Sequence, residues 1–207
     1  MTTFEIETPS GPGRVRLHRV RGARGALLLG HGAGGGVEAA DLQAASQAAQ
    51  AQRLAVALVE QPYRVAGRRA PAPAPQLDAA WLAVVQRLHK RELRRLPLIF
   101  GGRSMGARVA CRTAPAGGAA AVLCLAFPLL PPGRATAAKP PTSRLAELEA
   151  TGVPTLVVQG ARDPFGMPAL GTGRSVVEVA GNHSLRADLA AVGAAVGEWL
   201  AGLALAA

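Results

Sequence analysis

A chain of 207 residues is long enough to bury a large core, and 49% of its residues are hydrophobic. Its net charge is +10, from 23 basic and 13 acidic residues, which makes an acidic polymer a candidate partner. Aromatic residues make up only 3% of the chain and do not alternate with the arginines, which argues against a platform for stacking nucleic-acid bases. We therefore expect a solvated, arginine-biased surface that steers anionic substrates, and no nucleic-acid site.

The two cysteines, Cys111 and Cys124, lack the spacing of a metal site or of a disulfide framework, and we expect buried thiols. The first 15 residues have no apolar signal-peptide core. The apolar tail at 189–207 has helical spacing and contains Glu198, which favours a core helix over a membrane anchor. We expect a cytoplasmic protein that binds no membrane and needs neither a cofactor nor a metal.

Eight short runs of β-forming residues predict strands. They lie at residues 4–7, 15–20, 26–29, 54–60, 96–100, 121–127, 154–158 and 175–179. After the first two, they alternate with helical stretches, which predicts an α/β fold: a doubly wound, mostly parallel sheet with helices on both faces. Because no internal repeat or long linker interrupts this pattern, residues 1–207 are predicted to form a single domain.

The third predicted strand leads into a glycine-rich loop, Gly30-His31-Gly32-Ala33-Gly34-Gly35-Gly36. Backbone without side chains can approach a substrate closely, so an amide of this loop can stabilise an oxyanion. We predict the Ala33 amide as that donor, with Gly34 as a close substitute. The loop also satisfies G-x-G-x-x-G, and Glu60 ends the next strand, so a dinucleotide site is a competing interpretation. That motif is easily met in a glycine-rich chain and leaves the later motifs unexplained.

The fifth predicted strand is followed by Gly102-Arg103-Ser104-Met105-Gly106 and by a helix-compatible stretch at 107–113. This is G-x-S-x-G between a strand and a helix, the setting of a nucleophile elbow. The two glycines keep the strand and the helix from colliding at the sharp turn. Ser104 is the predicted nucleophile, and the Met105 amide is the predicted second oxyanion donor. A glycine-rich turn without catalytic function is the simpler alternative.

A serine hydroxyl needs a base to remove its proton and an acid to orient that base. Asp163 follows the strand at 154–158, and His183 follows the strand at 175–179. Loops at the carboxyl ends of parallel strands lie at one edge of the sheet, so both can meet Ser104 although they lie 59 and 79 positions beyond it. Asp163 is the predicted acid and His183 the predicted base. Each also has an ordinary interpretation, as the start of a turn or of a helix.

Apolar residues recur every three or four positions near the end of the chain, which predicts a helix with one face on the sheet. These positions are Leu185, Leu189, Val192, Val196, Trp199 and Leu203.

These segments together resemble a known family. The glycine loop, the elbow, the stretch at 159–166 and Asn182-His183-Ser184 are similar to the small lidless α/β-hydrolases near dienelactone hydrolases. That family includes a testis-expressed protein and a subunit of a nuclear histone acetyltransferase complex. The resemblance covers residues from about 25 to the end and implies an α/β-hydrolase fold, with Ser104, Asp163 and His183 as nucleophile, acid and base. Dienelactone hydrolases use a cysteine nucleophile, so their substrate is not transferred to this chain.

Only 26 residues separate Phe127 from Pro154, where many hydrolases of this fold insert a lid domain, and we expect none here. This segment is rich in proline, and we expect a loop near the mouth of the site, followed by a short helix at 143–150. An open mouth suits a small or flexible substrate.

The sequence thus predicts a serine hydrolase that cleaves an ester or thioester through an acyl-enzyme intermediate. His183 deprotonates Ser104, Asp163 orients the imidazole, and the amides of Met105 and Ala33 hold the oxyanion. Activity should rise with pH as the base becomes neutral. The alternative is a catalytically silent binding or scaffold protein that keeps the fold, because fold alone does not determine function.

Overall fold

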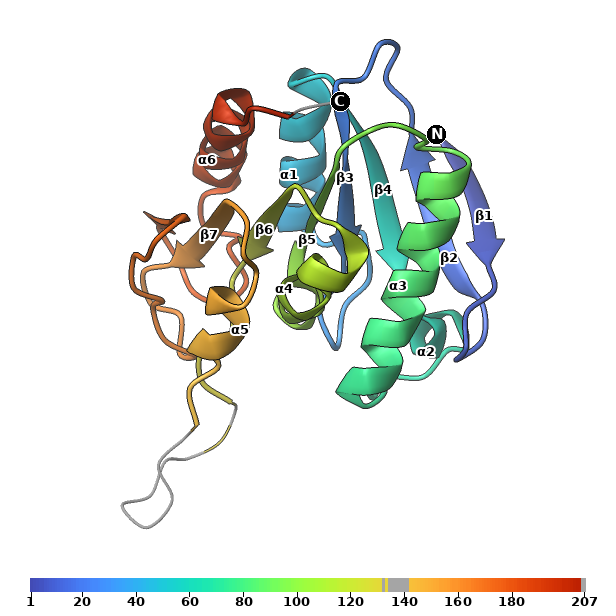
Figure 1. The fold of residues 1–207 in the computed structure, drawn as a ribbon. Helices are drawn as coiled ribbons and strands as arrows, with labels where there is room; N and C mark the ends of the chain where they lie inside the picture. Colours follow the sequence, from blue (N-terminus) through green and yellow to red (C-terminus); the bar gives the residue numbers. More distant parts are fainter. Residues whose placement is uncertain (132, 134–141, 206–207) are drawn as a thin grey trace.

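A computed structural model describes residues 1–131, 133 and 142–205 (Figure 1). All eight predicted strands are present, with boundaries shifted by a few residues. They are β1 (Thr2–Ile6), β2 (Gly13–His18), β3 (Gly25–Gly30), β4 (Leu54–Glu60), β5 (Leu98–Arg103), β6 (Ala121–Leu125), β7 (Thr155–Gly160) and β8 (Arg174–Val179). They form one sheet in the order β1-β2-β4-β3-β5-β6-β7-β8.

The sheet is mostly parallel, as predicted. The β1–β2 and β2–β4 pairs are antiparallel, and the other five pairs are parallel. All six residues of β3 are buried, which is typical of a parallel strand covered on both faces. Burial alternates along β2, as expected where one face of a strand meets the solvent.

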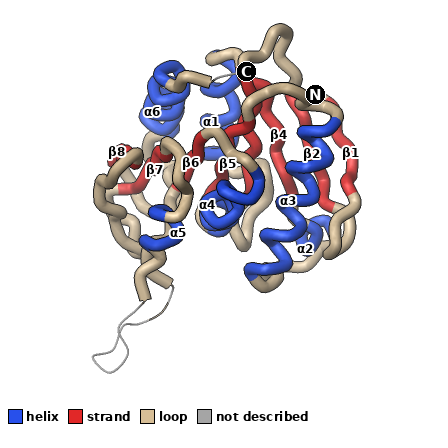
Figure 2. The backbone as a smooth tube through the Cα atoms, viewed as in Figure 1, coloured by secondary structure: helices blue, strands red, loops and turns tan. Residues whose placement is uncertain are grey.

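Helices cover both faces of the sheet (Figure 1, Figure 2). They are α1 (Ala40–Ala51), α2 (Pro62–Val65), α3 (Ala74–Lys90), α4 (Met105–Gly117), α5 (Leu145–Glu149) and α6 (Leu189–Gly202). Helices α3 and α4 pack on one face, over a core that contains Trp81 and Phe100 in edge-to-face contact. Helices α1 and α6 pack on the other, over a core that contains Leu42 and Val196. This confirms the predicted doubly wound arrangement.

The last helix begins later than its apolar pattern suggests. Leu185 is buried but has a φ of 52°, so it belongs to the turn after β8. The side chain of Asp188 accepts a hydrogen bond of 2.8 Å from the amide of Ala191, which makes Asp188 the N-cap. From there α6 packs on α1 and β7. An apolar repeat cannot separate a buried turn residue from the first residue of a helix.

The connection from β6 to β7 carries helix α5, and in the described part of the chain it carries no lid domain. Part of the proline-rich loop expected near the mouth lies outside the described residues, namely Pro132, Pro140 and Pro141. The short helix expected at 143–150 is present as Leu145–Glu149.

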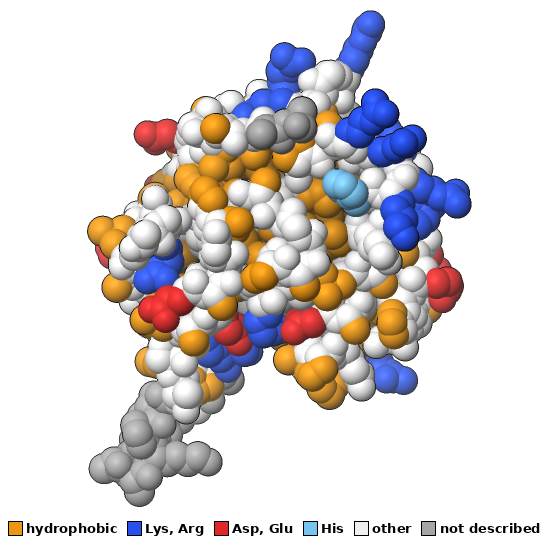
Figure 3. All heavy atoms as spheres, in the orientation of Figure 1, with side chains coloured by type: hydrophobic (Ala, Val, Ile, Leu, Met, Phe, Trp, Pro, Cys, Tyr) orange, Lys and Arg blue, Asp and Glu red, His pale blue; other side chains and the backbone are white. Residues whose placement is uncertain are grey.

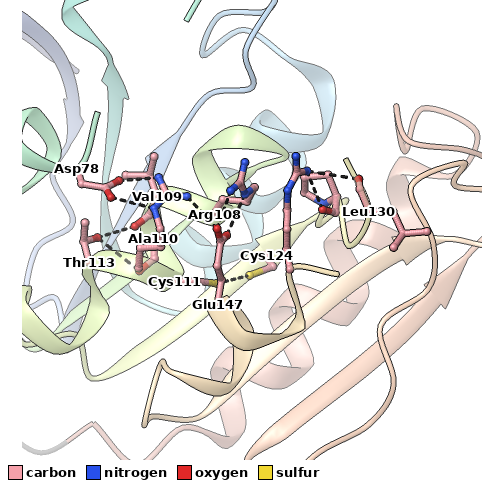
Figure 4. A network of polar contacts seen from close by, with 12 residues as sticks. Asp78, Arg108, Val109, Ala110, Cys111, Thr113, Cys124, Leu130 and Glu147 are labelled. Carbon is pink, nitrogen blue, oxygen red and sulfur yellow. Dashed lines mark hydrogen bonds and ion pairs between the residues drawn. The ribbon is translucent and has the colours of Figure 1, made fainter. Parts of the chain in front are cut away.

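An ion-pair network ties α5 to the helices beside it (Figure 4). Arg108 of α4 contacts both carboxylate oxygens of Glu147, at 2.9 and 2.6 Å. Arg112, one turn further along α4, contacts Glu147 at 3.4 Å and Asp78 of α3 at 2.6 Å. Paired donors on a planar guanidinium make such contacts directional. The network therefore fixes α5 relative to α3 and α4.

Cys111 and Cys124 are free, fully buried thiols, as predicted, and their sulfur atoms lie 3.4 Å apart (Figure 4). Burial raises the pKa of the Cys124 thiol well above its usual value, because the thiolate would be desolvated. A thiol held in this protonated form is a weak nucleophile.

Basic side chains are conspicuous on the surface (Figure 3), and several of them also stabilise the fold. Arg14 pairs with Glu5 at 2.9 Å, and Arg16 pairs with Glu38. The guanidinium of Arg24 donates to the carbonyls of Gln52, Leu200 and Leu203, at the carboxyl ends of α1 and α6. A cation at these ends also suits the helix dipoles. The expectation of a solvated arginine surface is therefore correct only in part.

Within the described residues, no helix has the length and apolar content needed to cross a bilayer.

Candidate active site

The turn around Ser104 has the geometry expected of an elbow. Ser104 stands between the last residue of β5 and the first of α4, with φ 52° and ψ −109°. A positive φ is uncommon and strained for a residue with a side chain. A Cβ added to Gly102 would lie 2.6 Å from the carbonyl oxygen of Gly30, and one added to Gly106 would also collide with that carbonyl. Both glycines are therefore required for α4 to pack against β3.

The structure brings Ser104, Asp163 and His183 into contact. His183 lies on the loop after β8, and its Nε2 is 2.9 Å from the Ser104 hydroxyl. Its Nδ1 is 2.8 Å from Oδ2 of Asp163, on the loop after β7. The three side chains come from the carboxyl ends of three parallel strands, where α/β sheets build their sites.

The carboxylate of Asp163 is held by further hydrogen bonds. Its Oδ2 also accepts from the side-chain amide of Gln159 at 2.9 Å, and its Oδ1 accepts from the backbone N–H of Phe165 at 2.9 Å. The side chain is 1% exposed. Both oxygens of the carboxylate therefore accept a hydrogen bond from an amide, which fixes its orientation toward His183. The Phe165 ring also packs edge-on against the His183 ring, with centroids 4.6 Å apart.

The glycine loop after β3 lies beside the elbow. A Cβ on Gly32 would be 3.7 Å from that of Ser104. The amide of Gly35 bonds to the carbonyl of Gly32 at 3.3 Å, which leaves Ala33 and Gly34 at the centre of a turn. The Tyr63 hydroxyl donates to the Ala33 carbonyl at 2.8 Å and thereby fixes the turn. Burial raises the pKa of Tyr63 to about 12, so the hydroxyl stays protonated and able to donate.

The amide of Met105 is at the first position of α4, where an N–H has no acceptor within its own helix. It follows Ser104 directly in the chain. The predicted donors therefore come from two segments that meet at Ser104, and the donor from the glycine loop is the amide of Ala33 or of Gly34.

A protein-family model described as an alpha/beta hydrolase domain matches residues 23–187. The chain belongs to the alpha/beta hydrolase family. None of the curated proteins matches its sequence.

Solved structures with this fold include three bacterial proteins that align over nearly all of the chain. An alpha-beta serine hydrolase homologue from Coxiella burnetii is 17% identical, with a TM-score of 0.75 over 96% of this chain and 97% of its own. A serine hydrolase without lid from Xanthomonas campestris is 18% identical, with a TM-score of 0.70 over 95% and 92%. A dienelactone hydrolase from Anabaena variabilis is 19% identical, with a TM-score of 0.74 over 96% and 95%. At these identities the likeness shows the fold.

In this alpha/beta hydrolase the competing dinucleotide interpretation finds no support. The helix after the glycine loop begins only at Ala40, so the loop amides are not at its N-terminus, where a pyrophosphate would bind. Glu60, the candidate ribose ligand, lies 3.7 Å from Arg14 and 3.9 Å from Arg16 of β2.

His31 is a structural histidine. It is fully buried, its Nε2 accepts from the amide of Gln61 at 3.0 Å, and its Nδ1 is 2.8 Å from the carbonyl of Gly32. These partners require the neutral ring with the proton on Nδ1. Burial lowers the pKa of His31, although the hydrogen bond to Gly32 opposes the shift. The ring thus joins the glycine loop to the segment after β4.

The burial of His31 predicts that the free energy of unfolding of the protein decreases as the pH falls. The unfolded chain binds a proton at histidine near pH 6.5, whereas His31 in the folded protein resists protonation because its pKa is lowered. The unfolded state therefore binds more protons below about pH 6.5, and stability drops by up to about 1.4 kcal/mol per pH unit from this group. Urea unfolding between about pH 7.5 and 5.5 measures it. His31→Gln should flatten the dependence, and His89→Gln, at an exposed site on α3, should not; equal slopes in all three proteins would contradict this account.

Several residues around the site were not identified from the sequence. Gln159 holds Asp163, Tyr63 holds the glycine loop, and Arg103 contacts the His183 loop. Gln159 had a usable signal, because a polar residue inside an apolar strand needs a partner. Arg103 had none, because the position before the serine in G-x-S-x-G accepts any residue.

Proposed function

We propose that this protein is a serine hydrolase that cleaves an ester or thioester through an acyl-enzyme intermediate. The observation that carries the proposal is the continuous chain of hydrogen bonds from Asp163 through His183 to the Ser104 hydroxyl, at 2.8 and 2.9 Å. The family supports it too, since structural neighbours include serine hydrolases.

In this mechanism Nε2 of His183 takes the proton of Ser104 as its oxygen attacks the carbonyl carbon. Asp163 keeps the ring proton on Nδ1, so that Nε2 is free to accept, and it stabilises the imidazolium that forms. The amides of Met105 and of Ala33 or Gly34 hold the oxyanion. The imidazolium then protonates the departing alcohol or thiol. A water molecule, deprotonated by His183, attacks the acyl-enzyme and releases the acid and free Ser104.

The open site favours small or flexible substrates. The loops after β3 and β8 lie at the elbow, and within the described residues the connection from β6 to β7 carries no lid domain. The ring of Phe165 beside His183 and the thioether of Met105 beside Tyr63 offer apolar contacts for a short acyl or alcohol group.

The alternative is a binding or scaffold protein with the same fold and a silent site. The narrower resemblance, to the group with the testis-expressed protein and the histone acetyltransferase subunit, stays a prediction, and it is the main reason to keep this alternative. The positive φ of Ser104 is strained and lowers the stability of the fold. Backbone strain of this kind is concentrated at functional sites. This favours the enzyme.

Labelling with a fluorophosphonate probe tests the proposal. We expect wild type to be labelled and Ser104→Ala to be unlabelled, with hydrolysis of 4-nitrophenyl acetate reduced by about 10⁴-fold or more. Ser10→Ala, at an exposed serine before β2, is the matched control and should be labelled like wild type. A folded wild-type protein that does not react would favour the scaffold alternative.

A further inference from the structure

We infer that Arg103 is a positioning residue that holds the main chain of His183 against the elbow. The inference rests on the proposed function, since it concerns the placement of the base relative to the nucleophile. Arg103 is the last residue of β5 and directly precedes Ser104. Its guanidinium Nη2 donates to the backbone carbonyl of His183 at 3.0 Å.

The same guanidinium also pairs with a buried carboxylate. Its Nε lies 2.8 Å from Oδ2 of Asp41, in the first turn of α1. The Asp41 side chain is 1% exposed and that of Arg103 is 20% exposed. Burial raises the pKa of the Asp41 carboxyl, and the charge of Arg103 opposes that rise. A carboxylate this deeply buried needs its cation, so the pair resists separation.

The third neighbour of the guanidinium is the glycine loop. A Cβ added to Gly32 would lie 2.8 Å from Nη1 of Arg103 and 3.7 Å from the Cβ of Ser104. Glycine at this position lets the guanidinium lie against the loop that supplies the predicted oxyanion donor. Arg103 therefore touches the base loop, the glycine loop and α1 from one position beside the nucleophile.

His183 needs such a contact because its side-chain partners do not determine its main-chain position. The bonds to Ser104 and Asp163 orient the ring only. The loop that carries it contains two residues with positive φ, Gly181 at 111° and Leu185 at 52°. Glycine adopts a positive φ freely, but a residue with a side chain, such as Leu185, keeps one only when the surrounding structure holds it. Arg103 holds this loop through its hydrogen bond to the carbonyl of His183. A displacement of the base by about 1 Å can lower the rate by about 100-fold.

Because Arg103 is inferred to hold the main chain of His183 and not to touch the substrate, its loss should affect kcat and KM differently. A positioning role affects the steps in which His183 transfers protons, and those determine kcat. Binding of a small ester depends little on the base, so KM should change by less than about twofold. A purely structural role would lower the amount of folded enzyme and leave kcat per active site unchanged.

The test compares Arg103→Gln, Arg103→Lys and Arg112→Gln. Arg112 is the matched control, because its guanidinium is also 20% exposed and also pairs with an aspartate, Asp78, but does not contact His183. Kinetics with 4-nitrophenyl acetate are normalised to active sites titrated with the fluorophosphonate. We expect Arg103→Gln to lower kcat by about tenfold to 100-fold, with little change in KM. Arg103→Lys should fall in between, since an ammonium keeps the charge but cannot span both partners.

Arg112→Gln should keep kcat within about twofold of wild type while losing comparable thermal stability. An unchanged kcat in Arg103→Gln, or an equal loss in Arg112→Gln, would overturn the inference. If Arg103→Gln does not fold, Asp41→Asn replaces it: loss of the anchor should lower kcat by about fivefold, and an unchanged kcat would overturn the inference.

These results are distinct from failure of the proposed function, in which wild type itself is not labelled. In that case the NMR signal of the His183 Nδ1 proton decides, because Arg103→Gln should shift it and Arg112→Gln should not.

Discussion

Asp163→Asn should lower kcat by about 10³- to 10⁴-fold and leave the protein folded. The carboxylate accepts three hydrogen bonds, from Nδ1 of His183, the amide of Gln159 and the backbone N–H of Phe165. Asparagine has one acceptor oxygen in place of two. If that oxygen faces Phe165, the new NH₂ group faces His183 and requires an unprotonated Nδ1. The ring proton then moves to Nε2, where it blocks acceptance of the Ser104 proton.

The measurement is esterase activity of the purified variant, together with its melting temperature. Asp188→Asn is the control, because this N-cap of α6 accepts from Ala191 and does not touch the site; asparagine caps helices well, so both activity and stability should be retained. A variant at Asp163 with more than about one tenth of wild-type kcat would mean that His183 does not depend on this carboxylate. Loss of folding instead of activity would point to a structural role for Asp163.

Gly106→Ala should destabilise the protein by about 3 kcal/mol or more. The added methyl group would collide with the carbonyl of Gly30, and it would lie 2.8 Å from the carbonyl oxygen of His31. Both obstacles are backbone of a central strand and of the loop after it, so neither can move aside without disturbing the sheet. Overpacking against atoms that cannot move costs at least the upper end of the usual range. For a chain of this length the melting temperature should fall by about 6–12 °C.

Gly35→Ala is the matched control, since a Cβ there meets nothing within 4 Å. Its melting temperature should stay within about 2 °C of wild type. If Gly106→Ala is equally stable, α4 does not pack against β3 as closely as described. The combination also separates a requirement for glycine at the elbow from a general sensitivity of this glycine-rich chain to alanine.

The sequence predicted the parts of this protein that are encoded locally. Continuous apolar runs such as β4 and the helical spacing of α3 identify elements, because periodicity and burial are properties of neighbouring residues. The elbow at Ser104 was also predictable, since its glycines are required by a turn a few residues long. The pairing of Ser104 with Asp163 and His183 followed from topology, as loops after parallel strands open at one edge.

Other features depend on contacts between distant segments. Leu185 looked like the start of a helix, but packing after β8 makes it a turn residue. The contact of Arg103 with the carbonyl of His183 joins residues 80 positions apart, and no pattern near either residue indicates it. The buried partner Asp41 is equally ordinary in sequence, an acidic residue in the first turn of a helix.

By itself, then, the sequence determined the class of fold, the order of its elements and three polar residues at the ends of the right strands. Only the tertiary structure decided that Nε2 of His183 lies 2.9 Å from the Ser104 hydroxyl and that Gln159, Tyr63 and Arg103 hold the surroundings in place. The reason is physical. Secondary structure follows from local periodicity, whereas a hydrogen bond between loops depends on how a whole sheet twists and packs, to within a fraction of an ångström.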